Sequence, residues 1–242
     1  MKKIMNIAAK FGLLILLSFP AVSCDKLDTV GNYSIRSFGE LLNSAPQLVS
    51  EDETNDGWSF AAPDNSARFI WSRNFVASRN SAASRDSAAS PLFDVMLEFD
   101  AAPFIAAGLD PARLPAHFYF NSENNALMTG IKIETEPAQY NGEITPLASY
   151  EQIVKLRRQA IGYHGQLDHY GVDLGNGNMF EWAKDVTTND KDMVFVLNPE
   201  PFIAAGTDPD RIEGWLFTQV TVDDENGKPV QVDKILKPFD LR

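Results

Sequence analysis

The chain has 242 residues, of which 44% are hydrophobic and 11% aromatic, and its formal net charge is −12. This apolar content is enough to form a folded core, which excludes a disordered chain. The acidic balance argues against nucleic-acid binding, because an anionic surface repels the phosphate backbone.

The first 23 residues predict an export signal. Lys2, Lys3 and Lys10 give a basic start, and residues 11–19 form an almost unbroken apolar run. This run is too short to cross a bilayer as a helix, so it favours a cleaved signal over a transmembrane anchor. After Phe19 no stretch approaches about 18 consecutive apolar residues, and we expect no membrane-spanning helix in the mature chain.

Cys24 is the only cysteine, and it directly follows Ala21-Val22-Ser23. This junction resembles the lipobox of bacterial lipoproteins, with Ala21 where leucine is usual. The resemblance covers only the N-terminal stretch. It implies that the Cys24 thiol carries a diacylglyceryl group, that cleavage occurs before Cys24, and that the new amine is acylated, for example by palmitate. A bystander thiol is the alternative, but a single free thiol is unusual in an exported protein. We therefore expect a lipid-anchored protein of the bacterial cell envelope. The sequence leaves open which membrane holds the anchor and on which face of it the protein lies.

One phrase occurs twice in the chain. The sequence Phe-Ile-Ala-Ala-Gly at 104–108 returns at 202–206, and the flanking Pro, Asp-Pro and Arg residues return at the same offset. Identity this dense at one offset predicts an internal duplication. The predicted organisation is a signal (1–23), a tether (24–35), a first unit (36–136), a linker (137–147) and a second unit (148–242).

Each unit is predicted to open with a helix. The sequences at 37–40 and 149–152 both fit a capping box, with a serine followed three residues later by Glu or Gln. The helices are expected to stop near Pro46 and Gly162. Strands follow, with a short helix at the repeated phrase and a closing hairpin. They are predicted at 58–60, 69–71, 94–99, 117–120 and 127–133, and at 170–172, 180–182, 192–197, 215–222 and 230–236.

The fold class predicted from these elements is α+β, with two units side by side, each an antiparallel sheet flanked by two helices. The first unit also contains a Ser/Ala/Arg segment at 72–91 that is absent from the second. Its low complexity predicts a flexible insertion, and its arginines leave open a docking loop for an anionic partner.

The repeated phrase could mark a site, because Asp110 with Arg113 and Asp208 with Arg211 are possible paired ligands. Structural roles explain the same residues. The Phe and Ile side chains would dock on the sheet, the Gly would end one short helix and the Asp-Pro would begin the next. We therefore expect a structural phrase.

The densest group of metal-capable side chains contains His164, Asp168, His169 and Asp173. The two histidines are five residues apart, which is not the helical i, i+4 spacing of a shared ligand face. A polar loop is the favoured interpretation, so no metal site is predicted, and His164 and His169 are the only candidates for one. The sequence has no Gly-x-Ser-x-Gly motif and no phosphate-binding glycine loop, so neither a catalytic residue nor a cofactor is predicted.

Four tryptophans lie in or near the predicted strands and are candidates for lining a ligand cavity: Trp58, Trp71, Trp182 and Trp215. Core packing is the alternative role. The sequence thus predicts a non-catalytic, lipid-anchored module that binds a protein or a hydrophobic small molecule. A carrier of lipid or another hydrophobic ligand is the first alternative, and an envelope hydrolase is the second.

Overall fold

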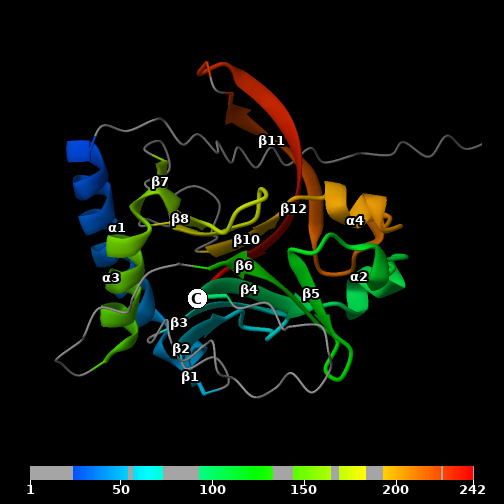
Figure 1. The fold of residues 1–242 in the computed structure, drawn as a ribbon, viewed down its shortest axis with the longest axis horizontal. Helices are drawn as coiled ribbons and strands as arrows, with labels where there is room; N and C mark the ends of the chain where they lie inside the picture. The colour runs from blue at the N-terminus through cyan, green and yellow to red at the C-terminus, as the bar shows by residue number, and fades with distance from the viewer. Residues whose placement is uncertain are drawn as a thin grey trace, which may run out of the picture.

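The computed structural model describes residues 24–53, 57–72, 93–132, 144–164, 169–183, 193–224 and 226–241. The predicted signal, the insertion after residue 72 and the linker before residue 144 lie outside these ranges. The described part is an α+β structure with two six-stranded antiparallel sheets and few helices (Figure 1). The predicted class and the antiparallel sheets are therefore confirmed.

The first sheet has the strand order β1-β2-β3-β4-β6-β5. Helix α1 precedes this sheet, and the short helix α2 connects β4 to β5. The elements are α1 (Cys24–Ser44), β1 (Val49–Asp52), β2 (Gly57–Ala61), β3 (Ala67–Ser72), β4 (Val95–Asp100), α2 (Ala102–Ala106), β5 (Phe118–Asn121) and β6 (Ala126–Ile131).

The second sheet has the order β7-β8-β9-β10-β12-β11, which repeats the pattern of the first. Helix α3 precedes it, and α4 connects β10 to β11. The elements are α3 (Pro146–Leu156), β7 (Ile161–His164), β8 (His169–Asp173), β9 (Met179–Ala183), β10 (Met193–Leu197), α4 (Glu200–Ala204), β11 (Leu216–Asp223) and β12 (Pro229–Phe239). Single 3-10 turns stand at 46–48, 111–113, 158–160 and 209–211.

Each sheet begins with a strand that the sequence did not predict. β1 has two exposed residues among its four and therefore lacks a clear apolar alternation. β7 was assigned to the end of the second helix, but α3 ends at Leu156 and a 3-10 turn separates it from β7. Gly162 is thus a strand residue and not a helix stop.

The segment predicted as a tether, 24–35, lies within the helix α1. Val30 and Ile35 pack against the core, and Phe38 and Leu41 farther along the helix are buried in it. These positions share one helical face, so burial of that face stabilises the helix well before the predicted start at Ser37.

The two predicted capping boxes are also wrong. Ser37 lies inside α1, where its hydroxyl accepts a hydrogen bond from Trp182 Nε1 at 3.1 Å. The N-cap of α3 is Thr145, whose Oγ1 accepts from the Ala148 N–H. Ser149 donates its hydroxyl hydrogen to the Ser72 carbonyl at 2.8 Å. Both serines therefore join a helix to a strand of the other half of the chain.

The two sheets pack face to face around one core. The rings of Phe69 on β3 and Phe180 on β9 stack with centroids 4.6 Å apart, and Trp71 and Trp182 lie fully buried beside them. The two predicted units therefore share one core, a question that the sequence left open. The aromatic side chains of both sheets fill the space between them, and the polar side chains of the strands lie on the outer faces.

The predicted flanking of each sheet by two helices is not confirmed. Helix α1 contacts α3 and β7, whereas α3 contacts β2 and β3. The two longer helices thus lie together at one end of the sheets, and α2 and α4 lie together at the other (Figure 1).

The two copies of the repeated phrase contact each other reciprocally. The Asp110 N–H donates to the Ala205 carbonyl at 3.0 Å, and the Asp208 N–H donates to the Ala107 carbonyl at 2.9 Å. Gly108 has a φ of 105°, and a Cβ on it would lie 2.7 Å from the Gly206 carbonyl oxygen. The glycine is required both for its conformation and for this close approach.

The apolar residues of the phrase divide into buried and exposed pairs. Phe104 and Phe202 are fully buried with ring centroids 5.1 Å apart. Ile105 and Ile203 are 38% and 46% exposed, so the prediction that they dock on the sheet is wrong.

Candidate functional site

A polar hollow lies on the outer face of the first sheet. Because side chains alternate along a strand, Phe69 and Trp71 of β3 point into the core and Arg68 points outward. We call this surface the first hollow. Its lining includes Ser50, Ser59, Asn65, Arg68, Glu98 and Asn125.

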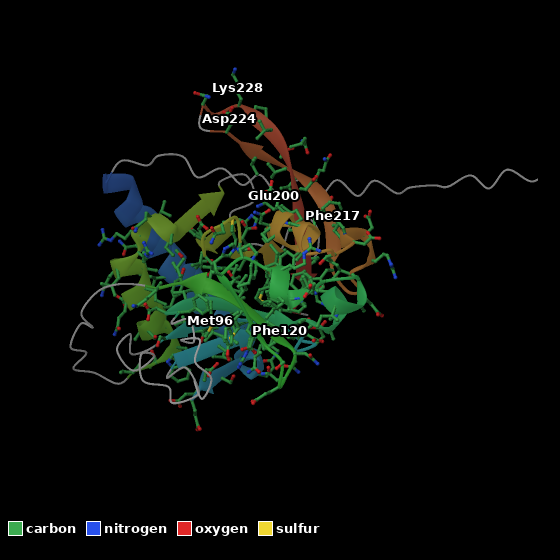
Figure 2. All side chains as sticks on the ribbon, turned by 45° about the vertical axis from the view of Figure 1, so that its right-hand side comes forward. Met96, Phe120, Glu200, Phe217, Asp224 and Lys228 are labelled. Atoms are coloured by element: carbon green, nitrogen blue, oxygen red, sulfur yellow. The ribbon has the colours of Figure 1, made fainter. Side chains whose placement is uncertain are left out.

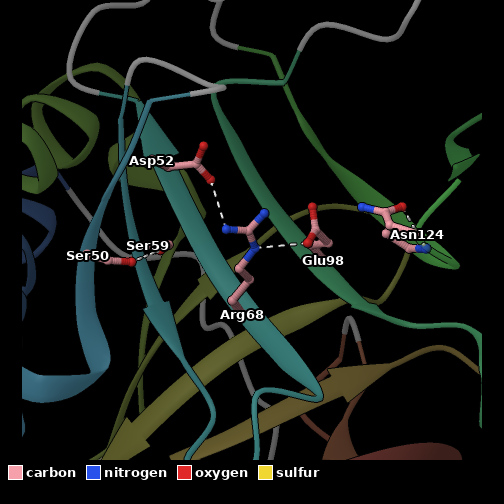
Figure 3. Close-up of polar contacts among 7 residues, drawn as sticks. Ser50, Asp52, Ser59, Arg68, Glu98 and Asn124 are labelled. Atoms are coloured by element: carbon pink, nitrogen blue, oxygen red, sulfur yellow. Dashed lines mark hydrogen bonds and ion pairs between the residues drawn. The ribbon is translucent and has the colours of Figure 1, made fainter. Parts of the chain in front are cut away.

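Arg68 joins two carboxylates at one side of the hollow (Figure 3). Its Nε donates to Glu98 Oε1 at 2.9 Å, and its Nη1 lies 3.2 Å from Asp52 Oδ2. Burial would lower the pKa of Arg68, but Glu98 and Asp52 outweigh it and raise that pKa. The guanidinium is therefore held in its charged form, and its charge is balanced by its neighbours.

Hydroxyl and amide groups complete the first hollow. Ser50 and Ser59 are cross-strand neighbours on β1 and β2, and their Oγ atoms lie 2.9 Å apart (Figure 3). Asn65 and Asn125 stand in turns with positive φ values of 55° and 53°. The hollow can form many hydrogen bonds to a polar molecule. The Glu98 carboxylate is already engaged by the Arg68 guanidinium.

A second hollow occupies the corresponding place on the second sheet, between the β8–β9 turn, the start of α4 and the β11–β12 hairpin. Lys234 on β12 donates from Nζ to the Gly177 carbonyl at 3.1 Å. Burial lowers the pKa of Lys234, and Glu181, Asp173 and Glu200 partly oppose this shift. In the repeat alignment Met179 stands where the first sheet has Arg68, so the two hollows differ in chemistry.

A buried carboxyl lies beneath Lys234. Glu181 of β9 is only 4% exposed, and burial raises its pKa to about 8, although Lys234 partly lowers it. His169 Nε2 lies 3.6 Å from Glu181 Oε2. At neutral pH this carboxyl holds its proton. Sequence reasoning missed Glu181, although it is the one charged residue between two buried aromatics in the Phe-Glu-Trp segment.

The two candidate metal-ligating histidines are direct cross-strand partners, as the last residue of β7 and the first residue of β8. Spacing along a helix could not have revealed this pairing. The His164 side chain and the whole of Asp168 lie outside the described residues. Within the described ranges, no group of three or more His, Cys, Asp and Glu side chains could hold a metal ion.

None of the four candidate tryptophans lines either hollow. Trp71 and Trp182 are buried in the core, and Trp58 and Trp215 pack against it. Trp71 Nε1 donates to the Pro146 carbonyl at 3.0 Å. In the structure these residues hold the sheets and helices together.

The acidic and basic residues of the repeated phrase serve its local geometry. The Asp110 side chain accepts from the Ala112 N–H, and that of Asp208 accepts from the Asp210 N–H. Arg113 Nη2 donates to the Ala204 carbonyl at 2.6 Å. The structure does not bring the two Asp–Arg pairs together as a ligand site.

Comparisons with protein-family models, with curated proteins and with solved structures found no match. Over the part of the chain that is described, no helix has the length and apolar character needed to cross a bilayer.

Proposed function

We propose that this chain is an exported bacterial lipoprotein, anchored through Cys24, that acts as a non-catalytic binding module. The anchor rests on Cys24 at the end of the apolar signal. Two or three acyl chains would make such an anchor effectively permanent, since each buried methylene contributes about 0.8 kcal/mol.

We also infer that the two sheets are duplicated copies of one unit, each carrying one longer and one short helix. Their equal strand order and the reciprocal hydrogen bonds between the repeated phrases support this. After duplication, one copy could keep a binding surface while the other changed. The equivalent positions Arg68 and Met179 carry different residues in the two copies, which fits that history.

The first hollow is our candidate ligand site, and its chemistry favours a neutral ligand with many hydroxyl groups, such as a sugar. The observation that carries this assignment is the pairing of Arg68 with both Asp52 and Glu98. The positive charge of Arg68 is already balanced by these two carboxylates. An anionic ligand would therefore be repelled by Asp52 and Glu98 and would find no unpaired Arg68 charge to bind. Hydroxyl groups can instead bond to the serine and amide side chains.

The alternatives receive less support from the described residues. A hydrophobic-ligand carrier needs an apolar cavity, whereas the space between the sheets is filled by aromatic side chains. A hydrolase using His169 would need an accessible acid–base pair, but Glu181 is 4% exposed and 3.6 Å from His169, beyond hydrogen-bonding distance.

A thermal-shift screen with mono- and disaccharides tests the ligand class. Ala102 is exposed and lines the first hollow, so Ala102→Trp should fill part of it; Ala106 is also exposed on α2 but does not line the hollow. We expect at least one sugar to raise the melting temperature of the wild type and of Ala106→Trp, but not of Ala102→Trp. Equal responses in all three proteins, or no response in the wild type, would contradict the assignment.

The anchor has its own test. Cys24→Ala should abolish incorporation of labelled palmitate and leave an uncleaved precursor, because the thiol takes the first lipid and both cleavage and acylation of the new amine follow that step. Normal labelling and processing of this variant would refute the lipoprotein assignment.

A further inference from the structure

The two sheets have four edge strands, and one of them differs from the others. β1, β5 and β7 are four residues long, whereas β11 has eight. β1 also ends in Glu51 and Asp52, and charge on a short edge discourages pairing with another chain. From Leu216 to Val222, β11 has no charged residue. Among the described strands it pairs only with β12.

The β11–β12 hairpin is anchored at its base and presents the outer edge of β11. Val220 is buried in a small apolar cluster with Leu236, whereas Leu216 is 45% exposed. The hairpin tip, marked by Asp224 and Lys228, projects away from the two sheets (Figure 2). The outer backbone groups of an edge strand can form a ladder with another strand.

We infer that two copies of this chain associate through antiparallel pairing of their β11 strands, about a two-fold axis at Gln219. Gln219 is the midpoint of the uncharged stretch 216–222. Centring the pair there overlaps the whole stretch in both copies. One continuous sheet then runs through the two molecules, and the contact is isologous.

The sequence of β11 is complementary to itself in this register. Exposed Leu216 lies opposite Val222 of the second copy, Thr218 lies opposite Val220, and Phe217 lies opposite Thr221. Such pairs of β-branched, aliphatic and aromatic side chains stabilise neighbouring strands.

Charge selects both the surface and the direction of pairing. The whole chain has a net charge of −12, so two copies repel each other over most of their surfaces and approach best along an uncharged strand. A parallel arrangement would place the acidic Asp224 of both copies side by side, whereas the antiparallel one separates the two. The self-complementary register of residues 216–222 favours a second copy over an unrelated extended peptide.

Cysteine cross-linking of the full chain, purified in mild detergent, tests the register. At the two-fold axis, the residues at position 219 stand directly opposite each other, within reach of a disulfide. Gln219→Cys should therefore give a reductant-sensitive dimer under mild oxidation. Gln231→Cys changes another exposed glutamine of the same hairpin, on β12, and should give no covalent dimer, and neither should the wild type. Equal cross-linking of the two variants, or none in Gln219→Cys, would overturn the inference.

Sedimentation velocity supplies a second measurement without an introduced thiol. The wild type should show a concentration-dependent species of twice the protomer mass. Gln219→Lys should raise its dissociation constant about tenfold, because two like charges then stand opposite each other. Gln231→Lys should leave it unchanged. A wild type that stays monomeric over the whole concentration series would refute the inference, as would equal effects of the two lysine variants.

Discussion

Glu181→Gln should remove a distinctive pH dependence from the stability of the protein. Burial raises the pKa of Glu181 to about 8, against the ordinary value of 4.5 that applies when the chain is unfolded. Between these values the unfolded chain loses a proton that the folded protein retains. The free energy of unfolding therefore falls as the pH rises through this window and levels off above about pH 8.

The size of the effect follows from the width of the window. A single proton difference changes the free energy of unfolding by ~1.4 kcal/mol per pH unit. The full window would give roughly 4 kcal/mol between pH 5 and 8, and relaxation around the buried group reduces this. We expect Glu181→Gln, whose amide does not ionise, to be more stable than the wild type by ~1–3 kcal/mol at pH 8. Near pH 5 the two proteins should differ little.

Urea unfolding followed by tryptophan fluorescence at pH 5, 6.5 and 8 measures this difference directly. Other groups titrate over the same range, but they are common to both proteins, so their contributions largely cancel in the comparison. Glu213→Gln, at an exposed position, is the control and should follow the wild type. If the stabilities of Glu181→Gln and the wild type run parallel from pH 5 to pH 8, the account of a buried, protonated Glu181 is refuted.

Two further predictions concern a close backbone contact and an ion pair. Gly108→Ala should lower the free energy of unfolding by at least ~2 kcal/mol, because the new Cβ would lie 2.7 Å from the Gly206 carbonyl oxygen in a backbone with φ of 105°. Gly227→Ala, also at positive φ but with nothing within 4 Å, should lose only about 1 kcal/mol, and equal losses in denaturant unfolding would contradict the close approach. Arg68→Ala should lower stability by about 2 kcal/mol in the same assay, because the Asp52 carboxylate, 3% exposed, loses a cationic partner. An unchanged unfolding midpoint would show that this ion pair does not stabilise the sheet.

Local patterns were sufficient to predict much of the fold. Short apolar and aromatic segments between turn residues identified most strands, and the Asn226-Gly227 turn lies at the tip of the β11–β12 hairpin as expected. The duplicated phrase was located from identity alone. Its reciprocal contact could not be predicted, because Asp110 and Ala205 are far apart in the chain and only the fold brings them together.

The errors arose where a distant partner determines a residue's role. Ser37 fits a capping box, yet its hydroxyl bonds to Trp182, which lies in the opposite half of the chain. Arg68 gave no signal in the sequence, since its carboxylate partners Asp52 and Glu98 belong to other strands. Glu181 looked like an ordinary strand carboxylate, because its burial depends on the packing of the whole outer face.

Mass spectrometry of the N-terminal peptide, from protein extracted out of membranes and digested with trypsin, tests the lipoprotein proposal most directly. We predict a peptide that begins at Cys24, ends at Lys26 and carries a diacylglyceryl group on the thiol. A peptide in which Ser23 remains joined to Cys24, or a mature Cys24 with an unmodified thiol, would contradict the proposal.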